Sequence, residues 1–187
     1  MRVVGGKYGG RKLNSPEGFG TRPPLEAVRQ AIFNMLSEHI EGAKVLDLFA
    51  GSGSMGIEAL SRGALSCVMV ESHRGALTFL RQNLKDLDIG SFVEVIADRL
   101  PAALSHPNIQ AQAFNIVLID PPFDAVQKGE FLKLRDMLLP SVVGGGLVVI
   151  RLPERCPTVP MSDAYELFKE RRYGISVVEI WRKKHGV

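Results

Sequence analysis

The sequence contains little cysteine: two residues, Cys67 and Cys156, in a chain of 187. Two isolated thiols do not build the disulfide framework of a small secreted protein. No C-x-x-C pair and no combined Cys and His spacing supports a zinc site. We therefore expect free thiols in a reducing compartment, no metal, and a cytoplasmic protein.

Long apolar runs are missing as well. No run approaches the ~20 residues that a membrane-spanning helix requires, and Met1-Arg2-Val3-Val4 leads into glycine and basic residues rather than into a secretory leader. We expect no membrane span and no export signal. The composition, 45% hydrophobic and 23% charged, is typical of a globular domain with a proper core.

Positive charge is concentrated at the two ends of the chain. The net charge is only +3, but residues 1–24 carry five basic residues and one acid, and residues 169–184 carry six basic residues and two acids. Each segment therefore has a net charge of +4, and the middle is acidic overall. This distribution indicates a polyanionic partner. Solubilising tails are the alternative explanation.

Residues 1–24 also contain six glycines and three prolines. We expect a small basic arm or hairpin, in which Val3-Val4 and Lys12-Leu13 pair, preceding one domain at 25–187. A glycine-rich backbone can follow an irregular surface, while arginine and lysine contact phosphates. The candidate RNA-binding residues are Arg2, Lys7, Tyr8, Arg11 and Lys12. Tyr8 would stack on a base, with ordinary packing as the alternative.

The segment Val45–Leu60 contains a strand followed by a glycine-rich turn and a helix. Val45–Phe49 is apolar, Gly51, Gly53 and Gly56 follow, and a helical pattern begins after them. Such a turn exposes backbone N–H groups at the start of the helix and lets a ligand approach closely. The glycines fit G-x-G-x-x-G, which on its own predicts a dinucleotide site only weakly.

Three acids argue against a dinucleotide. Asp47 lies in the first apolar run, and Glu71 and Asp98 follow the next two, so all three are expected at the carboxyl edge of one sheet. At roughly 6 Å and an effective dielectric of about 20, each carboxylate would cost a pyrophosphate about 3 kcal/mol. A cationic ligand with an amine, a ribose and an adenine suits the site, and S-adenosylmethionine is such a ligand.

The run Asp47-Leu48-Phe49-Ala50-Gly51-Ser52-Gly53 resembles the first motif of the class I S-adenosylmethionine-dependent methyltransferases. Asp120-Pro121-Pro122-Phe123 resembles the [DN]-P-P-[YF] tetrapeptide of enzymes that methylate exocyclic or amide nitrogens. With Arg2–Leu13 and Thr21-Arg22-Pro23, the chain resembles, over nearly its whole length, the RsmD family of bacterial 16S rRNA guanine-N2 methyltransferases. The resemblance implies S-adenosylmethionine as cofactor and 16S rRNA of the small ribosomal subunit as partner.

The resemblance and the strand ends together assign cofactor-binding roles. Asp47 would hold the methionine amino group, directly or through water, and Glu71 would meet the ribose hydroxyls. Asp98 would accept a hydrogen bond from the adenine amine. The alternative for Asp47 is a buried structural hydrogen bond. The alternative for Glu71 is capping of the helix that follows it, and the alternative for Asp98 is the N-cap of the next short helix. The remaining candidates for cofactor binding are Phe49, Ala50, Gly51, Ser52, Gly53 and, through the methionine carboxylate or an RNA phosphate, Arg22.

The proline tetrapeptide is the expected catalytic centre. A guanine N2 lone pair is delocalised into the ring, so acceptors must hold its hydrogens for the lone pair to face the methyl group. The Asp120 carboxylate and the Pro121 carbonyl can be these acceptors, and Pro121 and Pro122 offer no N–H donors. Phe123 offers a face for stacking. Whether Asp120 takes the proton or only orients the amine stays open.

Strands alternating with helices predict a Rossmann-like, doubly wound α/β fold with a mostly parallel seven-stranded sheet and an antiparallel last strand. Tyr173-Gly174 would join two late strands. Ser72 is the expected N-cap of the helix after the second strand. The expected strands are 43–49, 66–71, 92–97, 114–119, 146–151 and 175–183; the expected helices are 21–38, 54–62, 73–87, 99–105, 128–139 and 161–169.

Three other functions remain open. The same loop would serve a DNA adenine or a protein glutamine methyltransferase, although the basic arm argues against protein. The fold could also belong to a non-catalytic RNA-binding assembly protein, and a nicotinamide dehydrogenase is a more distant alternative. We expect a monomer, whose substrate guanine is presented by an assembled particle because no second RNA-binding domain is visible.

Overall fold

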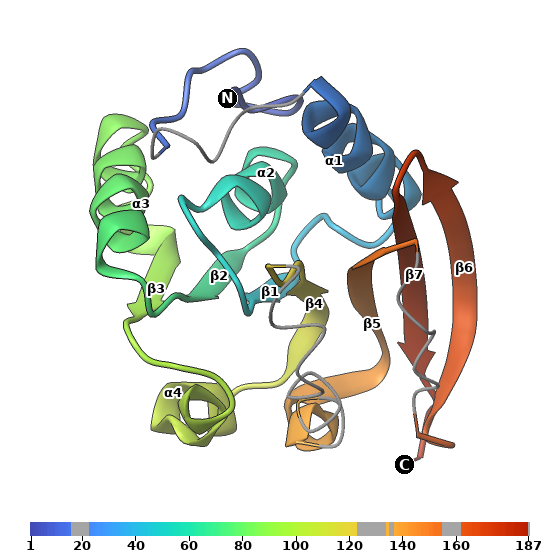
Figure 1. Ribbon diagram of the computed structural model, residues 1–187. Helices are drawn as coiled ribbons and strands as arrows, with labels where there is room; N and C mark the ends of the chain where they lie inside the picture. The colour runs from blue at the N-terminus through green and yellow to red at the C-terminus, as the bar shows by residue number, and fades with distance from the viewer. Residues whose placement is uncertain (16–22, 123–133, 135–136, 155–161, 187) are drawn as a thin grey trace.

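The computed structural model describes residues 1–15, 23–122, 134, 137–154 and 162–186. Within them, seven strands form one sheet in the order β3-β2-β1-β4-β5-β7-β6 (Figure 1). Neighbours from β3 to β5 pair in parallel, and β7 is antiparallel to both β5 and β6. The strands are β1 (Lys44–Asp47), β2 (Ser66–Val70), β3 (Val93–Ile96), β4 (Phe114–Ile119), β5 (Val142–Pro153), β6 (Tyr165–Tyr173) and β7 (Ser176–Lys183). The predicted sheet is confirmed.

Helices cover both faces of the sheet, as a parallel sheet requires. The helices α1 (Pro23–Met35), α2 (Ser54–Ser61) and α3 (Arg74–Asp86) lie on one face, and α4 (Pro107–Gln110) lies on the other (Figure 1). Each face has its own core, because alternate residues of β1 and β4 point to opposite sides. Short 3₁₀ helices occupy Gly90–Phe92, Ala102–Ser105 and Leu139–Ser141.

Several predicted boundaries are wrong. The predicted helix at 161–169 is replaced by strand β6, which pairs with β7 from Tyr165 to Tyr173. Its Glu, Leu, Lys and Arg residues favour a helix locally, and cross-strand pairing overrides that preference. The N-cap of α3 is His73 rather than Ser72, since the His73 Nδ1 accepts a hydrogen bond from the Ala76 N–H at 3.3 Å. The predicted helix 128–139 lies mostly outside the described residues.

The N-terminal arm is packed on the helical layer. Its two sides meet at an antiparallel bridge between Arg2 and Lys12. Val3 and Leu13 are each 2% exposed and belong to the core around α2. Figure 1 shows the arm crossing α2 on the side away from the sheet. A helix enclosed in this way has no solvent face, which explains why every residue of Met55–Ser61 is buried.

Two glycines of the arm provide a matched test of its packing. Gly6 and Gly10 have φ values of 73° and 80°, so alanine at either position is strained by about 1–2 kcal/mol. A Cβ at Gly6 would lie 1.8 Å from the Ser61 carbonyl oxygen of α2, whereas a Cβ at Gly10 would meet nothing within 4 Å. We expect Gly6→Ala to lower the free energy of unfolding by about 1–3 kcal/mol more than Gly10→Ala, measured by urea denaturation. Equal losses would contradict the docked arm.

Candidate active site

Four acids lie where parallel strands end on one edge of the sheet. Asp47 is the last residue of β1, and Glu71 and Asp120 directly follow β2 and β4. Asp98 lies two residues beyond β3. A small open cleft with a volume of about 40 Å³ at this edge is lined by Leu48, Phe49, Val70, Glu71, Ser72, Asp98 and Leu100. The structure therefore brings predicted residues Phe49, Glu71 and Asp98 to one cleft, with Asp47 buried beneath the glycine turn.

The glycine turn between β1 and α2 is shaped by its neighbours. Gly53 has a φ of 88°, and a Cβ there would lie 2.4 Å from the Leu80 Cδ1 of α3. Gly56 lies over β2, where a Cβ would meet the Met69 Cε at 2.4 Å. A side chain at Gly53 would require the Leu80 side chain to move, and one at Gly56 would require the Met69 side chain to move. Gly51, Ala50 and Ser52 complete the turn, and Ala50 and Ser52 are buried.

Asp47 is fully buried and connects β1 to α2. Its Oδ2 accepts a hydrogen bond from the Gly56 N–H at 3.0 Å, while its Oδ1 has no partner among the described residues. Burial, with smaller contributions from Asp120 and Glu71, raises the pKa of Asp47 to about 7. A buried structural hydrogen bond, the alternative role of Asp47, thus accounts for one carboxylate oxygen. The other is an acceptor suited to a ligand ammonium, and this role of Asp47 stays a prediction.

The raised pKa of Asp47 gives a pH-dependent stability. In the unfolded chain the carboxyl ionises near its ordinary value of 3.8, whereas in the folded protein it ionises at about 7. Between these values the folded state binds more protons, so the contribution of Asp47 to stability falls as the pH rises, by up to about 1.4 kcal/mol per pH unit. We expect the difference in free energy of unfolding between wild type and Asp47→Asn to shrink in this way from pH 4.5 to 7. If urea denaturation gives the same difference in free energy of unfolding between the two proteins at every pH from 4.5 to 7, the raised pKa of Asp47 is contradicted.

Glu71 joins the glycine turn to the start of α3. Its Oε2 accepts from the Gly51 N–H at 2.8 Å, and its Oε1 accepts from the N–H groups of Ser72 and His73, each at 2.7 Å. Glu71 therefore does cap the start of α3, which was the alternative to its role in ribose binding. Because Glu71 also lines the cleft, contact with a ribose is compatible with this arrangement and stays a prediction.

Asp98 and the proline loop occupy the remaining strand ends. Asp98 is exposed at the cleft, and its Oδ1 accepts from the Arg99 N–H at 2.7 Å. Pro121 is buried and Pro122 is exposed. The predicted residues Phe123 and Arg22 lie outside the described residues, so their roles stay predictions.

Asp120 forms an ion pair with Arg151 of β5. The Arg151 Nε lies 2.6 Å from the Asp120 Oδ1, and its Nη1 donates to the Ser176 Oγ at 3.4 Å. Burial raises the pKa of Asp120, and the Arg151 charge and hydrogen bond oppose that rise. A carboxylate at the end of β4 is therefore held in place from the neighbouring strand.

The predicted RNA-binding residues lie on the arm. Arg2, Lys7, Arg11 and Lys12 are exposed, and Tyr8 is half-buried against the core. Two of them also contact the protein: the Arg2 Nη1 donates to the Gly10 carbonyl, and the Arg11 Nη2 donates to the Asp86 carbonyl, both at 3.1 Å. The Lys7 Nζ lies 5.2 Å from the centre of the Tyr8 ring. Cationic groups are therefore displayed on a fixed hairpin.

Sequence reasoning missed a buried carboxylate, Glu58 of α2. It is 0% exposed and accepts from the N–H groups of Val4 at 2.7 Å and Gly5 at 2.9 Å. Its other partners are Arg62, with Nε at 2.7 Å, and Arg29, with Nε at 3.5 Å. An acid inside an otherwise apolar helix was the available signal. Arg29 of α1 is buried as well.

Asn83 of α3 was also missed, although it occupies the apolar stripe of its helix. Its Oδ1 accepts from the Asn14 N–H at 2.7 Å, and its Nδ2 donates to the carbonyls of Asn14 and Ser52, both at 2.9 Å. One buried amide thus joins the arm to the glycine turn. A polar residue in a stripe of leucines was the signal.

No group of three or more His, Cys, Asp or Glu side chains among the described residues is placed to hold a metal ion. In the same part of the chain, no helix combines the length and apolar character needed to cross a membrane.

Comparison with known proteins identifies the relatives of this chain. Residues 1–182 match the family described as Conserved hypothetical protein 95. The Haemophilus influenzae Ribosomal RNA small subunit methyltransferase D is 33% identical over 179 residues, covering 94% of this chain and 90% of the relative. The Bacillus subtilis protein YlbH is 32% identical over 189 residues, covering 98% of this chain and all of the relative.

Solved structures agree with the observed fold. The Escherichia coli protein yhhF has a TM-score of 0.86 at 29% identity, with 98% of each chain covered. An RNA methyltransferase from Salinibacter ruber, solved with S-adenosyl-L-homocysteine, has a TM-score of 0.65 at 16% identity, covering 94% of this chain and 96% of that one. The Rossmann-like methyltransferase fold is thus confirmed, and the sequence match shows that the chain belongs to the RsmD family, the family described as Conserved hypothetical protein 95.

Proposed function

We propose that this protein transfers a methyl group from S-adenosylmethionine to the exocyclic N2 amine of a guanine in 16S rRNA. The family and its named members support the general activity, S-adenosylmethionine-dependent methylation of rRNA. The observation that supports the nitrogen chemistry is the Asp120-Pro121-Pro122 loop at the end of β4, where Arg151 holds the carboxylate beside the cofactor edge of the sheet.

The residues present fit the cofactor. The cleft combines the apolar side chains of Leu48 and Phe49 with the carboxylates of Glu71 and Asp98. Beneath the turn, the Asp47 Oδ1 is a buried acceptor without a partner among the described residues. Apolar walls suit an adenine, and carboxylates suit ribose hydroxyls and an ammonium group. Phosphates would be repelled by the same acids, which is why a nicotinamide dinucleotide is disfavoured.

The loop residues prepare the amine. When bound, S-adenosylmethionine supplies an activated methyl group: the N2–carbon bond forms as the carbon–sulfur bond breaks, and N2 then loses one proton. Asp120 and the Pro121 carbonyl accept the two amine hydrogens, which turns the N2 lone pair towards the methyl group. Positioning of this kind supplies most of the acceleration, so no covalent intermediate with the enzyme is needed.

The exposed cations of the arm fit an RNA backbone. Arg2, Lys7, Arg11 and Lys12 would contact phosphates, while the target guanine leaves its stack to reach the loop. We further propose that an assembled small-subunit particle presents the guanine.

Substrate class is tested by supplying labelled S-adenosylmethionine with four acceptors: small-subunit particles lacking the modification, naked 16S rRNA, DNA and a glutamine-containing protein. We expect transfer to particles, less transfer to naked RNA, and none to DNA or protein. Equal rates on particles and naked RNA would remove the particle from the proposal. Transfer to DNA or protein alone would replace RNA as the substrate class.

A further inference from the structure

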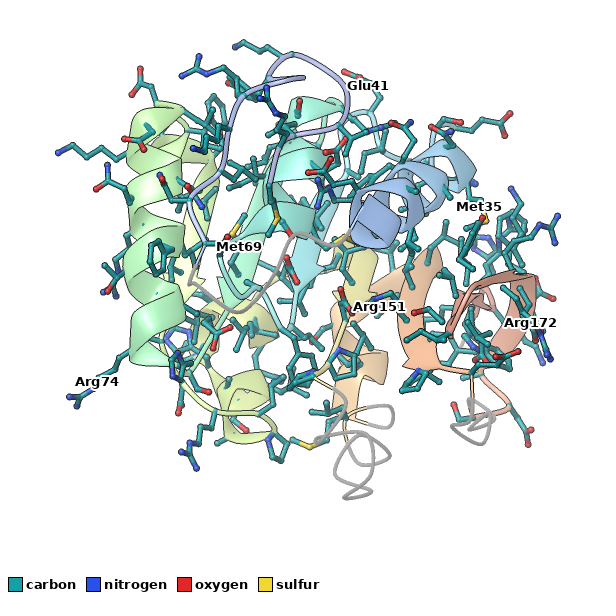
Figure 2. The ribbon with its side chains drawn as sticks, turned by 45° about the horizontal axis from the view of Figure 1, so that its top comes forward. Met35, Glu41, Met69, Arg74, Arg151 and Arg172 are labelled. Atoms are coloured by element: carbon teal, nitrogen blue, oxygen red, sulfur yellow. The ribbon has the colours of Figure 1, made fainter. Side chains whose placement is uncertain are left out.

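The ion pair between Asp120 and Arg151 follows from strand register. Ile119 of β4 pairs with Ile150 of β5, so the next residues, Asp120 and Arg151, are neighbours at the carboxyl edge. Their side chains point to the face of the sheet that carries α1 and α2, as does Asp47 of β1. Figure 2 shows Arg151 extending from β5 towards the neighbouring strand. The 2.6 Å contact joins residues 31 apart in sequence.

Arg151 is anchored at two points on different strands. Its Nε contacts the Asp120 Oδ1 beside β4, and its Nη1 donates to the Ser176 Oγ at the start of β7. A planar guanidinium held in this way fixes the orientation of the carboxylate. Among the described residues, the hydrogen bond to the Asp120 carboxylate is made at Oδ1, which leaves Oδ2 available for a substrate donor.

The charges around Asp120 come from two neighbouring strands. Arg151 of β5 lowers the pKa of Asp120, against the larger effect of burial. Asp47 of β1 faces it with like charge, since Asp120 contributes to the raised pKa of Asp47, as does Glu71. Within the described residues, Arg151 is the cation in contact with Asp120.

From this geometry we propose that Arg151 is a positioning residue, which holds Asp120 by Oδ1 as an ionised acceptor so that Oδ2 receives a hydrogen of the substrate amine. The proposal rests on the proposed function and deepens it. Arg151 keeps Asp120 ionised against the larger effect of burial on its pKa. In this proposal Asp120 orients the amine, and the proton released from N2 passes to water.

The test compares Arg151→Met, Arg151→Lys and Ser176→Ala with wild type. Methyl transfer to the RNA acceptor is measured as kcat/KM between pH 5.5 and 9.5, and S-adenosylmethionine affinity is measured by calorimetry. Without the arginine, burial raises the pKa of Asp120 unopposed. The protonated carboxyl then carries an O–H donor and only a neutral, weaker acceptor for the amine. We expect the acid limb of the Arg151→Met profile to move up by about 1–3 pH units, with activity recovering above it.

The other variants separate charge from folding. Arg151→Lys keeps a cation, so its acid limb should lie between those of wild type and Arg151→Met. Ser176→Ala keeps the ion pair, so its acid limb should stay in place. Cofactor affinity within about threefold of wild type shows that the fold is intact. If Arg151→Met does not fold, Arg151→Lys is compared with wild type alone. An acid limb of Arg151→Lys that coincides with that of wild type then overturns the proposal.

Two further outcomes are decisive. A loss in Arg151→Met that is the same at every pH would show a purely structural role and overturn the proposal. Wild-type protein that binds cofactor but methylates no nitrogen would overturn the proposed function itself. The two failures are distinguishable because only the first leaves wild-type activity in place.

Discussion

Asp120→Ala is expected to lower kcat for methyl transfer by about 10²–10³-fold, as removal of one hydrogen-bonding group from a reacting centre does. The variant loses the acceptor that orients the amine, and it also leaves Arg151 without its partner at 2.6 Å. Affinity for S-adenosylmethionine should change little, because Asp120 does not line the cleft. Single-turnover kinetics with labelled cofactor measure the first quantity, and calorimetry measures the second.

Asp120→Asn refines this result. It has a single amide oxygen, which cannot accept from Arg151 and from the amine at the same time. If Asp120 uses one oxygen for each, Asp120→Asn should lose nearly as much activity as Asp120→Ala. Asp163→Ala, which removes an exposed carboxyl outside the site, is the control and should behave as wild type. Full activity in Asp120→Ala would exclude the catalytic role of the loop.

Glu58→Ala is expected to lower the free energy of unfolding by about 3–5 kcal/mol, because it leaves the buried positive charge of Arg29 without its carboxylate partner. Arg29 is 4% exposed, and burial lowers its pKa while Glu58 opposes that shift. The N–H groups of Val4 and Gly5 lose their acceptor in the same variant. The arm, α1 and α2 meet at this one carboxylate, so its loss affects all three.

An exposed ion pair provides the control for Glu58. Glu154 and Arg172 lie 3.8 Å apart with side chains 47% and 67% exposed. Glu154→Ala should cost at most about 1 kcal/mol, as exposed pairs do. Urea denaturation of both variants gives the comparison. A Glu58→Ala variant as stable as Glu154→Ala would show that the arm is not held by this carboxylate.

The α/β core was predictable because its signals are local. The run 114–119 was predicted as a strand with the bounds that β4 has, since it is a short apolar run between polar residues. β6 was not predictable in this way. Its charged residues favour a helix, a bulge between Leu167 and Lys169 interrupts the strand alternation, and its stability comes from pairing with β7.

Some residues of the candidate site were likewise predictable from the sequence, and others required the tertiary structure. Glu71 and Asp98 were found because they lie at or just after the ends of predicted strands, which share one edge of a parallel sheet. Asp47 was found inside the first predicted strand, and Asp120 through the resemblance of its proline tetrapeptide to a known motif. The same rule would have selected Arg151, which follows the apolar run at 146–150 and meets Asp120 across the strand register. Glu58 and Asn83 required the tertiary structure, because their partners in the arm are 54 and 69 residues away.

The most direct test of the account is the identity of the methylated nucleoside. Hypomethylated small-subunit particles are incubated with the protein and methyl-labelled S-adenosylmethionine, and the RNA is digested to nucleosides for chromatography and mass spectrometry. We predict label in N2-methylguanosine with wild type and none above background with Asp120→Ala. Label in another nucleoside, or no label from protein shown by calorimetry to bind the cofactor, would contradict guanine N2 as the acceptor.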